Sequence, residues 1–103
     1  MERFQVTVDA MLESIMDRYM ELRIEELEQT EAAIKSGDGD TVRMLGHRLK
    51  GTGTSYGFPR LTELGVELEA AGLEGRLDDA AVLAVEVRAY IEHVDVVFQE
   101  TDD

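Results

Sequence analysis

The sequence predicts an all-α fold, an antiparallel up-down four-helix bundle that forms a single domain over residues 1–103. Apolar residues recur three and four positions apart along most of the chain, which is the spacing of one helix face. No window alternates polar and apolar residues long enough to predict a strand. Turn-forming residues gather at only three places: Ser36–Asp40, Gly57–Pro59 and Gly72–Gly75. Four amphipathic segments with short connections close most simply as an antiparallel bundle.

The first predicted helix runs from about Val8 to Lys35. Residues at helical spacing form its apolar side: Leu12, Met16, Met20, Ile24 and Leu27. One straight helix fits this pattern, and so do two helices with a break between Arg18 and Arg23. The second arrangement would place a short extra helix at the N-terminus, before a longer one.

The second predicted helix extends from about Thr41 to Tyr56. Asp40 is its expected N-cap, because an aspartate side chain can accept hydrogen bonds from the first free backbone amides of a helix. At about 100° per residue, five residues share one side of this helix and form its predicted core stripe. They are Val42, Leu45, Leu49, Thr52 and Tyr56.

The third predicted helix begins at Phe58-Pro59, where proline suits the first helical position, and ends near Ala71. The fourth runs from about Asp78 to about Phe98. Leu77 and Val82 have the spacing of a hydrophobic staple at its start. Its apolar stripe consists of Leu83, Val87, Tyr90, Val94 and Val97.

Composition and charge exclude several classes of function. The chain has no cysteine, which excludes disulfides and thiolate zinc sites, and its two histidines are too few for a multi-histidine metal cluster. Ten Lys and Arg against 23 Asp and Glu give a formal net charge of −13, which repels nucleic acid and anionic membranes. Without a leader or a membrane-spanning run, we expect a cytoplasmic protein whose partners are proteins.

Residues 41–62 differ from the rest of the chain because they contain no Asp or Glu. By proportion, a window of this length would hold about five acids, so their absence predicts a locally positive surface that attracts an anion or an acidic partner. The basic residues of this window are Arg43, Arg48, Lys50 and Arg60, together with His47.

His47 lies on the side of the second helix opposite the core stripe, so its imidazole is expected to point outward. Four residues share this outer side with it: Arg43, Lys50, Gly51 and Thr54. Arg43, Arg48 and Thr54 are candidate residues for docking a partner. The two arginines fit general electrostatics better than a specific contact, and Thr54 fits a surface hydroxyl equally well. We interpret the second histidine, His93, as a surface or boundary residue.

Three glycines, Gly46, Gly51 and Gly53, interrupt the second helix, and each costs about 1 kcal/mol relative to alanine. In a domain whose total stability is only about 5–10 kcal/mol, such a loss indicates close approach of another group. Gly51 would leave space beside the imidazole for a partner. Gly53 points elsewhere and is expected to allow tight packing against a neighbouring helix. Gly57 is expected to end the helix.

An exposed imidazole beside a lysine is suited to carry a phosphoryl group. Its ordinary pKa of about 6.5 leaves a neutral, nucleophilic ring nitrogen at neutral pH. A lysine one helical turn away can neutralise phosphoryl oxygens as charge shifts during transfer.

The run His47-Arg48-Leu49-Lys50-Gly51, followed by Gly57, resembles the signature of histidine-containing phosphotransfer (HPt) domains in bacterial two-component phosphorelays. The resemblance spans about residues 10–98. The flanking residues agree with it: Gly37-Asp38, Leu61, Leu64 and Leu68-Glu69-Ala70-Ala71. Gly46 departs from the family pattern, in which alanine is commoner, and this predicts a less rigid helix at that point.

The resemblance implies a phosphorelay intermediate without kinase activity of its own. It implies that His47 accepts the phosphoryl group on Nε2, that Lys50 stabilises its charge, and that Gly51 leaves the gap into which a receiver domain docks. The expected partners are response-regulator receivers and a hybrid histidine kinase. Magnesium in such transfers belongs to the receiver, so no cofactor is expected here. We expect a monomer.

Two rival hypotheses remain open from the sequence. One is a histidine-kinase dimerisation domain, which would carry its histidine in a different motif, usually followed by an acid, and would form an obligate dimer. The other is an adaptor bundle that binds receivers without being phosphorylated.

Overall fold

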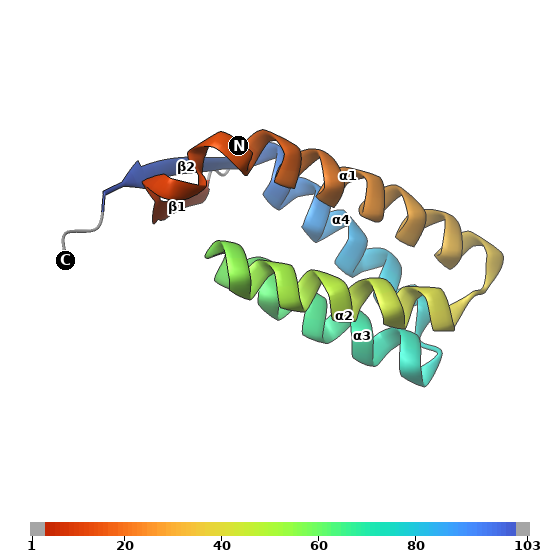
Figure 1. The fold of residues 1–103 in the computed structure, drawn as a ribbon. Coiled ribbons are helices and arrows are strands. Elements are labelled where there is room, and N and C mark those ends of the chain that lie inside the picture. Colours follow the sequence, from red (N-terminus) through yellow and green to blue (C-terminus); the bar gives the residue numbers. More distant parts are fainter. Residues whose placement is uncertain (1–3, 101–103) are drawn as a thin grey trace.

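The computed structural model describes residues 4–100, in which four helices pack together, as the sequence predicts (Figure 1). A pair of short strands lies at one end of the bundle, where α1 begins and α4 ends. The elements, in chain order, are β1 (Phe4–Asp9), the 3-10 turn η1 (Ala10–Leu12), α1 (Glu13–Ser36), α2 (Gly39–Tyr56), α3 (Pro59–Glu74), α4 (Leu77–His93) and β2 (Val94–Gln99).

Helix α1 is continuous from Glu13 to Ser36, so the alternative of a break between Arg18 and Arg23 is wrong. The short extra helical segment at the N-terminus is instead the 3-10 turn η1, which Asp9 caps by accepting a hydrogen bond from the amide of Met11. Among the described residues, no helix combines the length and the apolar character that a membrane crossing requires.

Glycine ends each of the first three helices. Gly37, Gly57 and Gly75 have φ angles of 76°, 84° and 72°, a left-handed conformation that strains most other residues. The prediction for Gly57 is therefore confirmed. The N-cap of α2 is Asp38, which accepts a hydrogen bond from the amide of Thr41, and the expectation of Asp40 was wrong because the helix begins two residues earlier.

The strand pair contradicts the expectation of a strand-free chain. β1 and β2 are parallel, in a register that runs from Phe4 opposite Val94 to Asp9 opposite Gln99. Helix α4 therefore ends at His93 instead of near Phe98. The strict alternation of apolar and polar residues over Phe4–Asp9 is typical of a strand, and the helical interpretation of this end of the chain overlooked it. Val94–Gln99 alternates less regularly, and its partner strand lies at the opposite end of the chain.

The core departs from the predicted apolar sides of both α1 and α4. Val97, predicted in the stripe of the fourth helix, lies in β2 and is exposed. On α1 the buried side is Met16, Tyr19, Arg23, Leu27, Thr30 and Ala33, so the predicted core residue Ile24 is exposed and a charged residue is buried in its place. On α4, Leu77 is the first helical residue and Val82 is exposed, so the predicted staple does not form. An apolar pattern cannot identify a buried arginine.

Helices α2 and α3 approach each other more closely than side chains would allow. A Cβ added to Gly46 would lie 2.4 Å from the amide nitrogen of Glu69, and one added to Gly53 would lie 2.7 Å from that of Thr62. On α3, a Cβ at Gly65 would meet the amide nitrogen of Lys50 at 2.4 Å. The packing role predicted for Gly53 is confirmed. Gly46 is required by the same contact, so it marks close packing and not a loosened helix.

Candidate functional site

His47 lies on the outer face of α2, and its side chain is 65% exposed, as the helical spacing predicts. Its Nδ1 atom is 2.9 Å from Oε2 of Glu69, a residue of α3. The other ring nitrogen, Nε2, makes no hydrogen bond to any residue within the described range 4–100. The imidazole is therefore held on one side by a neighbouring helix and presents its other side to solvent.

Glu69 is a candidate site residue that the sequence pattern did not identify. Its second oxygen, Oε1, accepts a hydrogen bond from Nζ of Lys50 at 3.1 Å, so one carboxylate contacts both candidate site residues of α2. Glu69 reaches them because Gly46 and Gly65 bring α2 and α3 close together. Its only sequence signal was its place in the flank Leu68-Glu69-Ala70-Ala71, which carries no information about distance.

The charge of Glu69 determines which tautomer of His47 is stabilised. The hydrogen bond from Lys50, and after it the one from His47, lowers the pKa of the Glu69 carboxyl below its ordinary value, so the group is ionised at neutral pH. An ionised carboxylate only accepts hydrogen bonds. This partner therefore assigns the ring proton to Nδ1 and leaves the lone pair on exposed Nε2.

Gly51 opens space beside the imidazole. A Cβ built on Gly51 meets no atom within 4 Å, in contrast to Gly46 and Gly53 in the same helix. The predicted bare patch is therefore present on the outer face of α2. A side chain of a partner protein can approach the backbone there without displacing any group of this chain.

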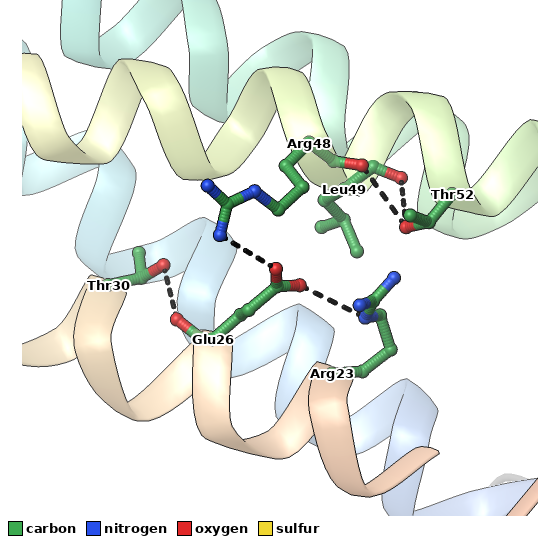
Figure 2. A network of polar contacts seen from close by, with 6 residues as sticks. All are labelled: Arg23, Glu26, Thr30, Arg48, Leu49 and Thr52. Carbon is green, nitrogen blue, oxygen red and sulfur yellow. Dashed lines mark hydrogen bonds and ion pairs between the residues drawn. The ribbon is translucent and has the colours of Figure 1, made fainter. Parts of the chain in front are cut away.

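Arg48 faces α1, and a network of charged residues holds it there (Figure 2). Its Nη1 atom is 3.2 Å from Oε2 of Glu26, whose Oε1 lies 3.0 Å from Nε of Arg23. Arg23 is only 5% exposed, and its guanidinium lies over the ring of Tyr19, 4.7 Å from the ring centroid. Burial also raises the pKa of the Tyr19 hydroxyl. The ion pair between Arg48 and Glu26 links α2 to α1.

The two remaining candidates lie along the edge where α2 meets α3. Arg43 is half-buried one turn before His47 and makes no ion pair with any residue between 4 and 100. Thr54 is exposed and tied to its surroundings, because its hydroxyl donates to the carbonyl of Lys50 and lies 3.1 Å from that of Thr62.

The predicted positive surface is largely neutralised by glutamates from other helices. Lys50 pairs with Glu69 and Arg48 with Glu26, although both acids lie outside the acid-free window of the sequence. A sequence window cannot show which charges the fold brings together. In the part of the chain that the structure describes, no group of three or more histidine, aspartate or glutamate side chains is placed to hold a metal ion.

Comparison with protein families agrees with the resemblance noted from the signature. The family model of the Hpt domain matches residues 8–96, which is most of the chain. Comparison with curated proteins and with solved structures gave no match. The matched range contains all four helices and the His47–Glu69–Lys50 site. The chain therefore belongs to the Hpt domain family, whose members carry out histidine phosphotransfer in phosphorelays.

Proposed function

We propose that this protein is a phosphorelay intermediate that accepts a phosphoryl group on Nε2 of His47 from a receiver-domain aspartate and passes it to another receiver. Hpt domains generally interact with receiver domains and lack a kinase catalytic domain. The observation that carries the proposal is the exposed imidazole whose Nδ1 is bound to Glu69 and whose Nε2 is open to a partner. We place its action in the cytoplasm, as is typical of the family.

In the accepting step, the lone pair of Nε2 attacks the phosphorus of the receiver's phosphoaspartate. The Nε2–P bond forms as the P–O bond to the aspartate breaks, and the bonding electron pair leaves with the aspartate carboxylate. Nδ1 keeps its proton throughout, so the ring gains positive charge facing the Glu69 carboxylate. No separate base is required, because neutral imidazole already carries the attacking pair. Donation to the next receiver reverses these changes.

Three residues act around the reacting atom in this proposal. Glu69 is a positioning residue that fixes the orientation and the tautomer of the imidazole. Lys50 supplies positive charge for the phosphoryl oxygens, and because Glu69 holds its Nζ at 3.1 Å, the ammonium is kept near the site before the phosphoryl group arrives. Gly51 admits the receiver. Arg43, which has no ion pair with any residue from 4 to 100, is a cation available to an acidic partner surface.

The decisive experiment incubates the protein with a panel of phosphorylated receiver domains from the source organism. We expect an acid-labile, base-stable label on the wild type and none on His47→Gln. His93→Gln is the matched control, because it removes the other histidine, and it should be labelled like the wild type. Label that persists on His47→Gln would overturn the assignment.

The same samples test the two rivals. Binding of unphosphorylated and phosphorylated receivers without any label on the wild type would favour the adaptor. An obligate dimer by light scattering would favour the histidine-kinase dimerisation domain, whereas we expect a monomer.

A further inference from the structure

A groove between α3 and α4 exposes apolar side chains on a surface that the proposed transfer does not use. Its volume is about 430 Å³, and its apolar lining is Val66, Ala70, Val82 and Leu83. Val66 is 48% and Val82 62% exposed, so no described segment of the chain covers them. Exposed apolar surface of this kind, bordered by polar residues, commonly marks an interaction site.

The rim of this groove is acidic. Three carboxylates, of Glu67, Asp79 and Glu86, line it together with a single guanidinium, that of Arg76. Ion pairs already engage Arg76 with Asp79 and Glu74, and Arg60, which lies outside the lining, pairs with Glu86. The lining carboxylates outnumber the lining guanidinium, which leaves excess negative charge around an apolar floor.

We propose that the α3–α4 groove is a docking site for a cationic amphipathic helix of a partner protein. Two adjacent helices offer a groove into which a third helix packs its apolar ridge, and anchors spaced three and four residues apart suit such a groove. Lysine or arginine beside those anchors would meet the acidic rim.

The same charges argue against other occupants of the groove. Nucleic acid and anionic lipid are repelled by a chain with a net charge of −13. A second copy of this chain would place one acidic rim against another. The comparable groove between α1 and α4 has no such acidic excess, because its rim combines Lys35 with a Glu31 that is paired to Arg88.

The groove lies close to the phosphotransfer site without overlapping it. Val66 is a neighbour of Glu69 on α3, three positions before it, at the edge of the groove. The opposite wall of the groove is on α4, with Val82, Leu83 and Glu86, whereas His47 and Lys50 are on α2. A helix bound in the groove would leave His47 open to a receiver. The inference goes beyond the proposed transfer and does not require His47 to be phosphorylated, so either proposal can fail while the other stands.

The test uses a synthetic amphipathic peptide of leucine and lysine at helical spacing, about 15 residues long so that it can form a stable helix. Amide chemical shifts of the whole protein should change along α3 and α4, centred on Val66, Ala70 and Val82. A peptide of the same pattern with glutamate in place of lysine should not bind. Shifts centred on Ile34 and Val85, or on the face that carries His47, would overturn the proposal.

Two matched variants separate docking from simple charge attraction. Val82→Asp should weaken binding of the leucine–lysine peptide at least about tenfold, whereas Val85→Asp should leave it unchanged. Both positions are exposed residues of α4, at 62% and 67%, so both variants are expected to fold, which circular dichroism verifies. Each change adds one negative charge, so charge attraction alone predicts tighter binding for both. Undiminished affinity in Val82→Asp, or self-association of the wild type through this groove, would overturn the proposal.

Discussion

Helix α2 contacts its two neighbours in opposite ways. Against α3 it presents glycines, and Gly46 and Gly53 lie where any side chain would collide with the facing backbone. Against α1 it presents Arg48, which meets Glu26 and, through it, the buried Arg23. The first contact sets the distance by the absence of side chains, whereas the second is filled by large side chains, among them this ion-pair network and the stacked rings of Tyr19 and Tyr56. The proposed phosphotransfer site lies on the first, where Glu69 comes within reach of His47.

This difference explains how Glu69, which the sequence pattern hardly distinguishes, comes to lie beside His47. A glycine contact leaves two backbones little freedom to move apart or slide, because both helices have a fixed surface there. The position of the Glu69 carboxylate relative to His47 therefore depends on the glycines and not on the flexibility of long side chains. The α1 contact, by contrast, includes ion pairs whose gain is opposed by the cost of removing charges from water.

The largest effect is expected when the charged contact is broken on one side only. Glu26→Gln leaves Arg23, which is 5% exposed, without a counter-charge, and should lower the free energy of unfolding by about 3 kcal/mol. Urea denaturation measures this difference. The double variant Arg23→Met, Glu26→Leu should recover most of the loss, because it removes both buried charges. A single variant as stable as the wild type would show that this contact contributes no electrostatic stability.

The glycine contact is tested by adding one methyl group to it. A Cβ at Gly65 would lie 2.4 Å from the amide nitrogen of Lys50, so Gly65→Ala should destabilise the protein by about 2 kcal/mol despite the better helix propensity of alanine. Gly51→Ala is the matched control. It meets no atom within 4 Å and should instead stabilise by about 0.5–1 kcal/mol. Equal changes in stability in the two variants would contradict the distinction between Gly65, which faces the backbone of α2, and Gly51, which faces open space.

A larger side chain at the outward glycine separates function from stability. Gly51→Leu should, like Gly51→Ala, raise the free energy of unfolding by at most about 1 kcal/mol, because the position is open to solvent and leucine is a good helix former. It should nevertheless slow transfer from a phosphorylated receiver at least about tenfold, since it displaces the docked partner from His47. Samples quenched at successive times measure the rate of phosphoryl transfer. Gly51→Ala should lower this rate much less than Gly51→Leu. A normal transfer rate in Gly51→Leu would remove the docking role of this glycine.

The smallest effect is expected from acid titration of the Glu69 contact. The hydrogen bonds from Lys50 and His47 lower the pKa of Glu69 in the folded protein below its ordinary value of 4.5. A carboxyl whose pKa is lowered by folding stabilises the folded state above its unfolded pKa, and this contribution is lost as the pH falls through the folded pKa. The wild type should therefore melt at a higher temperature than Glu69→Gln at neutral pH. This difference in melting temperature should disappear in acid. A difference that persists in acid would exclude an electrostatic cause.

Local patterns predicted the four helices and the outward face of α2 that carries His47, whereas the start of α1 and the end of α4 were placed too far outward. Three helix ends are encoded by glycines, and the core stripe of α2 follows helical spacing, so the outward position of His47 required no knowledge of tertiary structure. Features that depend on pairs of distant residues were missed. Glu69 is 22 positions from His47, and β1 pairs with a strand at the opposite end of the chain. The burial of Arg23 depends on Glu26 and Tyr19 together, which no apolar pattern encodes.

The parallel pairing of β1 and β2 has a mechanical consequence. Both strands run in the same direction, so pulling the beginning of β1 away from the end of β2 loads all the hydrogen bonds between them in shear. Those bonds must then break together, whereas a hairpin pulled from its open end unzips one bond at a time. Tension transmitted through adjoining segments would meet this ladder first. The helices behind it, with His47 among them, would be shielded until the ladder ruptures.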